Sequence, residues 1–501
     1  MTRQVAIVTV MLIAAAGVYA QQRKLGTIGP PPRQDPQRQT AAEGMPPLPL
    51  PAVPLRRSEP KAEPAPPLFI GKLKYGDTQD YMPNPADVDS LLRHVRSQLD
   101  AWYGWQLYGL DELVAAHAKG ESAKLPMLYI TGYEAFAFSD SERAALRQYL
   151  LDGGTLVADA ALGSPAFAKS FAAEMARIFP QHPLKPLPLD HPVFRGYYPY
   201  TNVHYFSVQG GTHTKSEGPP QFLGVTVAAR TAVIFSPYDM TCGWDEFYAP
   251  PAEVKVADAP RTMAMMPGDA IRMGINIVSY VSAQRRFAVS QAQTRQILGD
   301  QPQKRAGVPI AVLRHQGDWN PDPNALYQLV RLAANHTSMP IEYELRTVDP
   351  VLEQLADVTV LVIQGLDDPG LSDQDVAVLA RHVQAGGFIF INNTSGFATF
   401  DRAARDLVAR LAPDFKLEPV PQGHPLLTSL YAIDTMRDAG TAQPRPAVLE
   451  AVTIRDRAAI VYSPHDTLAH LKGIHDPYAN AYDRESASKL ALNILTYAVK
   501  R

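Results

Sequence analysis

The feature that most restricts how this chain can fold is a long internal repeat. Leu146–Gly163 reads LRQYLLDGGTLVADAALG, and Leu379–Gly396 reads LARHVQAGGFIFINNTSG. The first half carries Gly132, Ser139-Asp140, Gly153-Gly154, Gly163, Phe167 and His191-Pro192, and the second half repeats them as Gly365, Ser372-Asp373, Gly386-Gly387, Gly396, Phe400 and His424-Pro425. Matching residues stand 233 positions apart (365 − 132 = 233). The repeat indicates a duplicated domain, because solenoid repeats recur every ~20–50 residues.

Short apolar runs alternate with helical patterns in each copy. FIGKLKY, MLYITG, TLVADA and AVIFSP are predicted strands bounded by turn residues. SDSERAALRQYLLDGG is a predicted helix that begins at Ser139 and ends at Gly153. Strands that are apolar on both faces and alternate with helices favour a parallel sheet covered on both sides. The sequence therefore predicts an α/β chain with two doubly wound parallel-sheet domains.

The N-terminal segment is expected to lie outside these domains. Arg3 precedes the apolar stretch Val5–Ala20, which ends in the small-x-small sequence Val18-Tyr19-Ala20. This pattern predicts a signal peptide over residues 1–20, cut after Ala20, and a periplasmic or secreted protein. The stretch is shorter than the roughly 20 residues of a membrane span. An uncleaved anchor is the alternative, and no other integral membrane segment is expected.

Residues 21–67 are predicted to form a Pro-rich disordered tether, because 13 prolines lie between Pro30 and Pro67. The first domain is then expected over 68–285 (copy one), a linker over 286–307, and the second, diverged domain over 308–501 (copy two). The formal net charge of −3 gives no general attraction to nucleic acid. No nucleic-acid partner is expected.

Several stretches of copy one resemble the bacterial family called domain of unknown function 4159. The stretches are KLKYGD, YITGYEAFAFSDSERAALRQYLLDGGTLVADA, DHPVF, AVIFSPYD and GINIVSY. The likeness covers about residues 68–284, and copy two shares it more weakly over 308–500. It implies a flavodoxin-like fold similar to the class I glutamine amidotransferases.

The same resemblance also has a consequence for activity, which depends on the turn that follows the Gly-Gly pair and its strand. In glutaminases of this fold, that turn carries a Cys nucleophile, with a His and a Glu elsewhere. Here the matching positions are Asp159–Ala161 and Asn392–Thr394, and neither turn has a thiol. The covalent glutaminase mechanism therefore does not carry over. Related lineages bind sugars or are structural modules, so fold alone does not decide activity.

Four acidic residues follow predicted strands of copy one and are the candidate ligand-binding residues. They are Asp77, Glu134, Asp159 and Asp239. Ligands of open parallel sheets bind beyond the carboxyl ends of the strands. Four acids on that edge would suit a divalent cation such as Ca²⁺ or Mg²⁺, or the hydroxyls of a sugar. The alternative is that they only cap helices and shape turns.

Copy two presents Asp318, Asp367, Asn392 and Asp466 at the matching positions. An amide in place of the central acid weakens a metal or acid–base role there. Asp159 and His191 are the catalytic candidates. The repeated His-Pro of His191 and His424 could supply a base or could fix an extended segment.

His204 and His213 are a weaker zinc candidate, since their spacing matches no tight motif. The single cysteine, Cys242, is expected to be packed and not catalytic.

The sequence-based expectation is an exported cell-envelope module without glutaminase activity that binds a ligand or a partner, such as a carbohydrate or an envelope protein. The first alternative is a metal-assisted hydrolase that acts on a carbohydrate or similar polar substrate through the acidic edge of copy one. The second is an architectural role in an oligomer. No cofactor is expected beyond a possible divalent cation.

Overall fold

The computed structural model describes residues 68–76, 78–99, 101–118, 125–209, 212–245, 262–298, 307–339, 345–441, 443–471 and 473–500. The expected signal peptide and tether lie outside these residues, and so does Asp77. Both copies belong to one compact unit, Pro66–Arg501. Across the described part of the chain, none of the helices combines the length and the apolar character that crossing a membrane requires.

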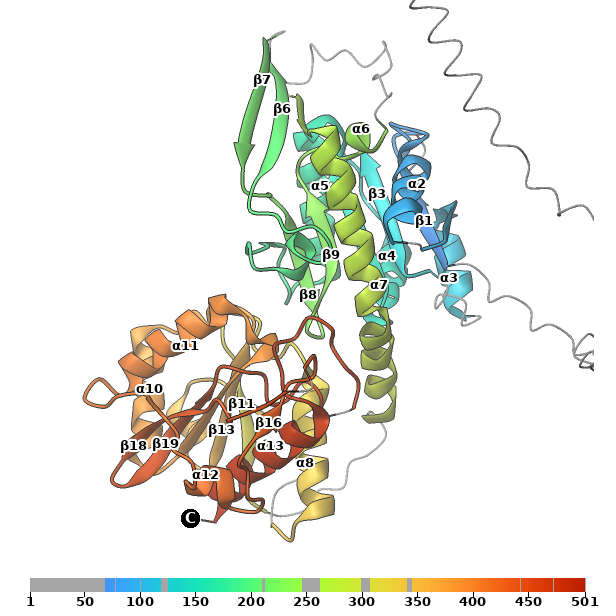
Figure 1. Cartoon of the computed structure of the whole chain (residues 1–501). Helices are drawn as coiled ribbons and strands as arrows, with labels where there is room; N and C mark the ends of the chain where they lie inside the picture. The colour runs from blue at the N-terminus through green and yellow to red at the C-terminus, as the bar shows by residue number, and fades with distance from the viewer. Residues whose placement is uncertain are drawn as a thin grey trace, which may run out of the picture. The chain divides into compact units, whose positions relative to one another are not determined.

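Copy one is built from a central sheet, a small second sheet and flanking helices (Figure 1). Its elements are β1 (Leu68–Lys74), α2 (Asp87–Leu99), β2 (Tyr103–Gly109), α3 (Leu110–Ala118), β3 (Met127–Gly132), α4 (Asp140–Leu151), β4 (Thr155–Ala160), the 3₁₀ helix η3 (Ala161–Gly163), α5 (Pro165–Ile178), β5 (Lys185–Pro186), η4 (Pro192–Phe194), β6 (Val203–Gln209), β7 (Thr212–Gly218), β8 (Leu223–Val227), β9 (Arg230–Ser236), α6 (Thr241–Trp244), β10 (Thr262–Met265) and α7 (Pro267–Leu298).

Copy two repeats this plan in a shorter form. Its elements are β11 (Ile310–Leu313), α8 (Pro323–His336), β12 (Arg346–Val348), α9 (Leu352–Leu355), β13 (Val360–Gly365), α10 (Asp373–Gln384), β14 (Phe388–Asn393), η5 (Thr394–Gly396), α11 (Ala398–Leu411), β15 (Glu418–Pro419), α12 (Pro425–Thr428), β16 (Met436–Arg437), β17 (Pro444–Arg445), β18 (Glu450–Ile454), β19 (Arg457–Ser463) and α13 (Arg484–Val499).

The strand order confirms that the two copies share one fold. The sheets run β2-β1-β3-β4-β9-β8-β5 and β12-β11-β13-β14-β19-β18-β15. The first five strands of each sheet are parallel, in the order of flavodoxin-like sheets, and the last two pair antiparallel at one edge. Copy one adds the three-stranded sheet β10-β6-β7, whose hairpin projects from the domain in Figure 1.

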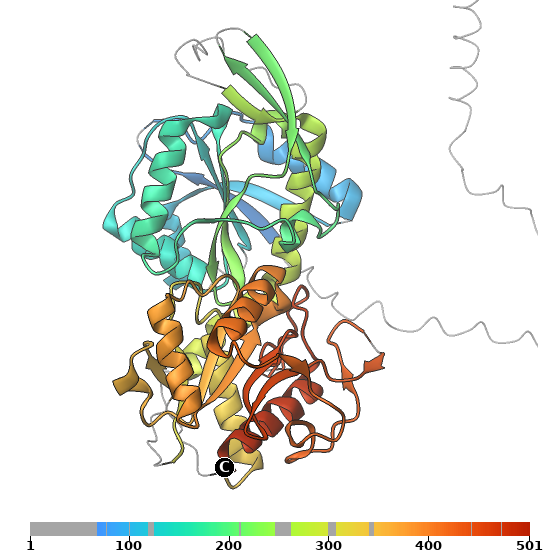
Figure 2. The same ribbon diagram turned by 90° about the vertical axis from the view of Figure 1, so that its left-hand side faces the viewer.

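Helices cover both faces of each sheet, which confirms the doubly wound prediction (Figure 2). In copy one, α4 and α5 pack on one face around Leu128 and Leu156, and α2 and α7 pack on the other around Met127 and Val157. Copy two has the same two layers, with α10 and α11 opposite α8 and α13. Successive residues of a strand thus point into two different hydrophobic cores, one on each face of the sheet, as a fully buried sheet requires.

Local sequence explains the repeated helix that leads into the central strand. Ser139 and Glu142 form a capping box at the start of α4, and Ser372 and Asp375 form the same box on α10. Each helix ends near a glycine in the left-handed region, Gly153 at φ +103° and Gly386 at φ +102°. The Gly-Gly sequence therefore terminates the helix and releases the chain into the buried strand.

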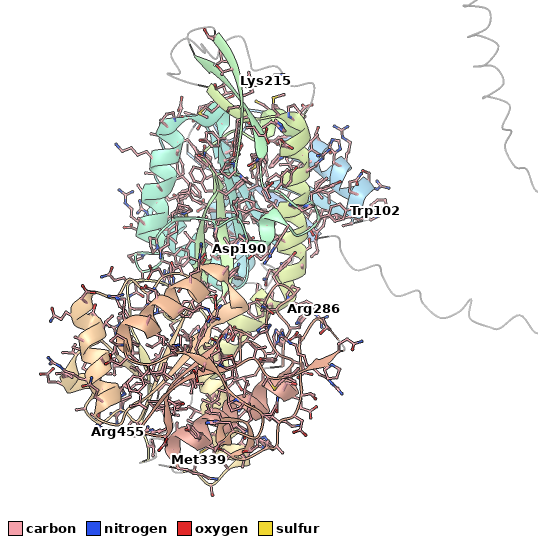
Figure 3. The ribbon with its side chains drawn as sticks, turned by 60° about the vertical axis from the view of Figure 1, so that its left-hand side comes forward. Trp102, Asp190, Lys215, Arg286, Met339 and Arg455 are labelled. Atoms are coloured by element: carbon pink, nitrogen blue, oxygen red, sulfur yellow. The ribbon has the colours of Figure 1, made fainter. Side chains whose placement is uncertain are left out.

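The copies pack head to tail, with the strand ends of copy two against the β8–β9 turn of copy one. Asp190 of copy one accepts a hydrogen bond from the backbone N–H of Ala398 in α11 (Oδ2···N 3.3 Å), and Figure 3 shows Asp190 at this junction. Ala228 and Ala229 form the docked turn and are buried. The equivalent turn of copy two, Arg455-Asp456, is exposed and charged. Only one of the two turns is thus suited to apolar contact.

Candidate functional site

The turn after the central strand has the same left-handed geometry in both copies. Leu162 in η3 has φ +51°, and Ser395 in η5 has φ +58°. Non-glycine residues rarely adopt positive φ, and such residues gather at functional sites. The sequence comparison placed this turn at Asp159–Ala161 and Asn392–Thr394, so it missed Ser395. Only the invariant glycine that follows, Gly163 or Gly396, marked the turn in the sequence.

Asp159 and Asp239 lie together beneath this turn in copy one, and both are buried. Asp159 accepts hydrogen bonds from the Tyr129 hydroxyl (Oη···Oδ1 2.5 Å) and the Met240 backbone N–H (N···Oδ2 2.8 Å). Asp239 accepts the Leu162 N–H (N···Oδ2 2.6 Å) and the Cys242 N–H (N···Oδ1 2.9 Å). The two carboxyl groups therefore tie the turn to the segment that follows β9.

Copy two builds the same connection with an amide. Asn392 accepts the Thr467 N–H (N···Oδ1 3.0 Å), and its own Nδ2 donates to Asp466 Oδ1 at 2.9 Å. Asp466 accepts the Ser395 N–H (N···Oδ2 2.7 Å). The repetition of these bonds supports the reading in which the strand-end acids shape the turn.

Copy one has the carboxyl group of Asp159 at the position where copy two has the amide of Asn392. This carboxyl group is buried close to a second one, that of Asp239. Complete burial and, after it, the nearby charge of Asp239 together raise the pKa of Asp159 to about 7. Hydrogen bonds from Met240 and Tyr129 oppose that shift. Copy one therefore has two neighbouring carboxyl groups where copy two has an amide that donates to Asp466.

Glu134 does not join this group. It is exposed, and its backbone N–H donates to Asp80 (N···Oδ2 3.0 Å). Asp80 also accepts the Tyr133 N–H (N···Oδ1 2.9 Å) and the Tyr75 hydroxyl (Oη···Oδ2 3.0 Å). The sequence did not single out Asp80, whose role as an acceptor for a strand-end loop depends on contacts between distant segments.

His191 caps the short helix η4. Its Nδ1 accepts the Val193 N–H at 3.1 Å, and its Nε2 lies 2.7 Å from the Thr231 hydroxyl. Burial lowers its pKa to about 3, with a smaller contribution from Arg195. His424 caps α12 in the same way through Leu426 (N···Nδ1 3.1 Å). The repeated His-Pro thus has a structural explanation, and His191 in addition faces a cavity.

The remaining candidates from the sequence are the zinc candidates His204 and His213 and the thiol of Cys242. His204 and His213 pair with Glu217 and Val208 in the β6–β7 ladder, four residues apart along the strand. Within the described ranges, no three His, Cys, Asp or Glu residues are placed to hold a metal ion. The Cys242 thiol lies 3.2 Å from Asp239 Oδ2, and burial followed by this carboxylate raises its pKa well above the ordinary range. A raised pKa disfavours the reactive thiolate.

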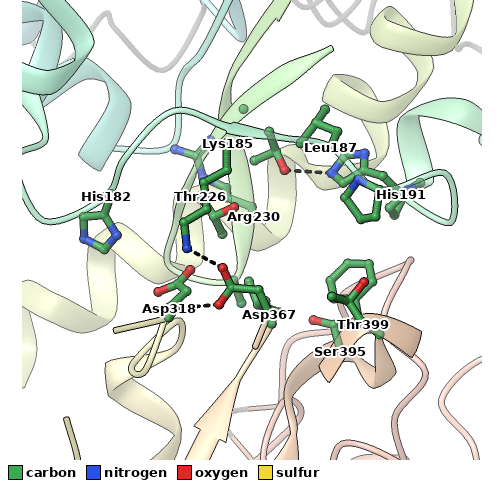
Figure 4. A pocket seen from close by; sticks show the side chains of 18 of the residues that line it. His182, Lys185, Leu187, His191, Thr226, Arg230, Asp318, Asp367, Ser395 and Thr399 are labelled. Atoms are coloured by element: carbon green, nitrogen blue, oxygen red, sulfur yellow. Dashed lines mark hydrogen bonds and ion pairs between the residues drawn. The ribbon is translucent and has the colours of Figure 1, made fainter. Parts of the chain in front are cut away.

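A cavity of about 290 Å³ lies where the strand ends of copy two meet copy one (Figure 4). Copy two contributes Asp318 after β11, Asp367 after β13 and Ser395 after β14. The polar wall of copy one consists of Lys185, His191, Thr226, Arg230, Thr231 and Gln284. This is the edge at which open parallel sheets bind ligands.

Three charged residues meet on one wall of this cavity, as Figure 4 shows. Lys185 of copy one forms an ion pair with Asp367, and the Asp318 N–H donates to Asp367 (N···Oδ1 2.7 Å). Burial and, after it, the charge of Asp367 raise the pKa of Asp318 to about 7, against the opposing effect of Lys185. Asp318 Oδ2 accepts no hydrogen bond from the described residues. An acceptor is thus left over for a ligand.

The Ser395 side chain is a second unpartnered group at the cavity. The residue is 6% exposed, and its Oγ has no partner in the described part of the chain. The following helix α11 has no cap from its own N-cap residue, Phe397, and its Ala398 N–H is bound by Asp190 of copy one, whereas Ser164 caps the equivalent helix α5. Copy two therefore takes from copy one a contact at its turn that copy one makes internally.

The comparison with known families finds a family model that matches the chain twice. The sequence model of the family described as "Domain of unknown function (DUF4159)" matches residues 70–281 and again 309–499. The chain therefore belongs to this family and contains two tandem copies of its domain, as the resemblance implied. No curated protein matches the chain.

Proposed function

We propose that this member of the DUF4159 family is a binding module without glutaminase activity, and that its ligand occupies the cavity between the two copies. The observation that carries the proposal is the cavity itself, with unpartnered Asp318 Oδ2 and Ser395 Oγ at the strand ends of copy two. The proposal includes export to the cell envelope, which rests on the composition of residues 1–67.

The absence of glutaminase activity follows from the two turns. The left-handed residue is Leu162 in copy one, which has no nucleophilic atom, and Ser395 in copy two, whose Oγ has no base within hydrogen-bond distance among the described residues. The one thiol, Cys242, sits against Asp239. A cysteine nucleophile needs a partner that lowers its pKa, and a neighbouring carboxylate does the opposite.

The chemistry of the cavity favours a hydroxyl-rich ligand such as a carbohydrate. Acceptor oxygens line its walls, and aromatic rings lie beside them: His191 and Phe397 stack with centroids 6.5 Å apart and planes 7° apart. Sugars present hydroxyl donors at their edges and apolar faces to aromatic rings. A site that combines acceptors with rings suits both features.

A metal-assisted hydrolase at Asp159 and Asp239 would need carboxylate oxygens that are free to bind a cation. Those oxygens accept hydrogen bonds from the protein instead. We therefore place the site in the cavity between the two copies, at the strand ends of copy two, and not at the acidic edge of copy one.

The test is ligand-dependent thermal unfolding of the chain Gln21–Arg501 with glucose, N-acetylglucosamine, glucosamine and glucuronate, and with Ca²⁺, Mg²⁺ and Zn²⁺. A ligand at 100 times its dissociation constant adds ~2.7 kcal/mol of stability. We expect a shift with at least one sugar and none with the metals. A metal shift that Asp159→Ala abolishes would instead support the hydrolase.

The repeat supplies a matched pair of variants for this test. Thr226 lies on β8 and lines the cavity, whereas Thr453 has the same place on β18 and is exposed. Thr226→Trp should fill the cavity and abolish the sugar-dependent shift, and Thr453→Trp should retain it. Equal shifts in both variants would exclude the cavity as the binding site.

A further inference from the structure

The cavity has a second polar corner, where α7 of copy one meets the segment between β19 and α13. Gln284 on α7 donates from Nε2 to Asp476 Oδ1 at 2.9 Å. The backbone N–H of Tyr478 donates to the same oxygen at 2.9 Å. Both side chains line the cavity and are buried, with Asp476 2% and Gln284 5% exposed. This corner is therefore built by residues from both copies.

Two acceptor oxygens at this corner lack a donor within the described residues. Gln284 Oε1 has no hydrogen-bond partner there. Both hydrogen bonds to the Asp476 carboxyl group reach Oδ1, which leaves Oδ2 without one. An unsatisfied buried acceptor costs roughly 1–3 kcal/mol, so a donor supplied by a ligand is favoured here.

Asp476 is a buried acid with no ion-pair partner among the described residues. Burial, with a small contribution from Asp466, raises the pKa of Asp476 to about 6, although the hydrogen bonds from Tyr478 and Gln284 and the nearby His470 oppose the shift. His470 Nε2 accepts the Asp476 backbone N–H at 3.1 Å, so that ring faces the main chain and not the carboxyl group. No lysine or arginine ion pair to Asp476 occurs among the described residues.

Two aromatic rings complete the corner. Tyr280 of α7 and Tyr478 stack with centroids 5.4 Å apart and planes 27° apart, and both line the cavity. The faces of tyrosine rings attract cations. A carboxylate, an amide oxygen and two ring systems together form the usual surroundings of a bound ammonium group.

We infer that the ligand of the cavity carries a protonated amine, which binds at the corner formed by Asp476, Gln284, Tyr280 and Tyr478. This inference rests on the proposed function and specifies its ligand class, an amino sugar or another hydroxylated amine. An ammonium group has three N–H donors and can reach both Asp476 Oδ2 and Gln284 Oε1. A hydroxyl group has one donor and no charge, so it cannot satisfy both acceptors.

The test compares matched amines and alcohols: glucosamine with glucose, and 1,4-diaminobutane with 1,4-butanediol. Calorimetric titration of the chain Gln21–Arg501 near neutral pH should give at least tenfold tighter binding of the amine in one pair. Asp476→Asn should reduce that ratio to near one while glucose affinity is retained. Asp368→Asn, an exposed acid outside the cavity, should leave the ratio unchanged. Lowering the pH below about 6 should also reduce the ratio, because Asp476 then holds a proton.

The outcomes separate this inference from the proposed function. Equal binding of amine and alcohol would overturn the inference and leave a sugar-binding cavity in place. Binding of none of the four compounds would overturn both. A preference for the amine that survives in Asp476→Asn would place the ammonium elsewhere and overturn the inference. If Asp476→Asn does not fold, Gln284→Leu removes the other acceptor and should weaken amine binding selectively.

Discussion

The two copies share one connection at the central turn but differ in what surrounds it. In copy one, the buried residues around this connection include the ion pair of Lys72 and Asp87, with Nζ 2.6 Å from Oδ2 and both side chains fully buried. Lys72 pairs with Tyr129 in the β1–β3 register, and Val312 pairs with Val362 at the same place in copy two. Copy two thus has apolar residues where copy one has buried charges.

The two copies also differ at the strand-end edges of their central sheets. Copy one satisfies its strand-end acids internally, and the residue at its turn is Leu162. Copy two has Ser395 at that place and opens onto a cavity that copy one completes. Copy one has a closed, charged interior, and copy two supplies the strand ends of the proposed ligand site. Exchanging residues between the copies tests this division of roles.

The largest expected effect is the loss of Lys72. Lys72→Met leaves the Asp87 carboxylate buried without its partner, which should lower the free energy of unfolding by about 3–5 kcal/mol. Denaturant unfolding measures this change. The double variant Lys72→Val/Asp87→Ala introduces the residues of copy two (Val312 and Ala325) and should recover most of the loss. A double variant as unstable as Lys72→Met would contradict the comparison.

A second exchange concerns the docked turn. Ala228→Arg/Ala229→Asp installs the exposed turn of copy two in the buried junction and should cost about 1–3 kcal/mol through overpacking and buried charge. We expect calorimetry to resolve two unfolding transitions instead of one, since the copies separate. The reverse exchange, Arg455→Ala/Asp456→Ala, should change stability by less than about 0.5 kcal/mol. A single unshifted transition in the first variant would show that the junction is not apolar packing.

Asp159→Asn gives copy one the amide of copy two and should stabilise it by roughly 1 kcal/mol near neutral pH. The carboxyl group titrates near 3.9 when unfolded and at about 7 when folded. Between these values, only the folded state holds the proton, so the wild-type protein loses stability as the pH rises from about 4 to about 7. The advantage of the variant should therefore grow across this window and level off above it. Thermal unfolding at pH 4 and pH 8 measures this, and an equal advantage at both would refute the raised pKa of Asp159.

The smallest effect is expected for Lys185→Ala. The ion pair with Asp367 is partly exposed, with side-chain exposures of 42% and 27%. Such pairs contribute about 0–1 kcal/mol to stability. The measurement is the denaturant midpoint, with Arg93→Ala as the control, because Arg93 forms an exposed pair with Asp89. A loss above about 2 kcal/mol would show that Lys185 holds the copies together.

Much of the fold could be predicted from the sequence, because the relevant information is local. The Gly-Gly helix ends, the capping serines and the apolar strands all lie within the repeated segment. The sequence placed Asp159 and Asp239 on one strand-end edge together with Asp77 and Glu134, and Glu134 does not join them. Most of the hydrogen bonds that occupy the oxygens of Asp159 and Asp239 come from backbone groups, which have no sequence pattern.

The cavity could not be predicted for a related reason. It depends on which turn of copy one docks on copy two, and the Ala228-Ala229 turn is distinguished only by its small, uncharged residues. Ser395 escaped notice because its left-handed conformation, and not its neighbours in sequence, marks it. Gln284 and Asp476 meet across 192 positions, so no spacing argument could have joined them.

Hydrogen exchange of the chain Gln21–Arg501 with and without saturating glucose or glucosamine tests the central claim most directly. The claim is that ligand binds in the cavity between the copies, at the strand ends of copy two, and not at the strand ends of copy one. It predicts slower exchange in peptides covering 226–231, 316–318 and 395–399, with no change in peptides covering 160–163 and 239–242. Protection confined to those last two segments, or no protection by either sugar, would contradict it.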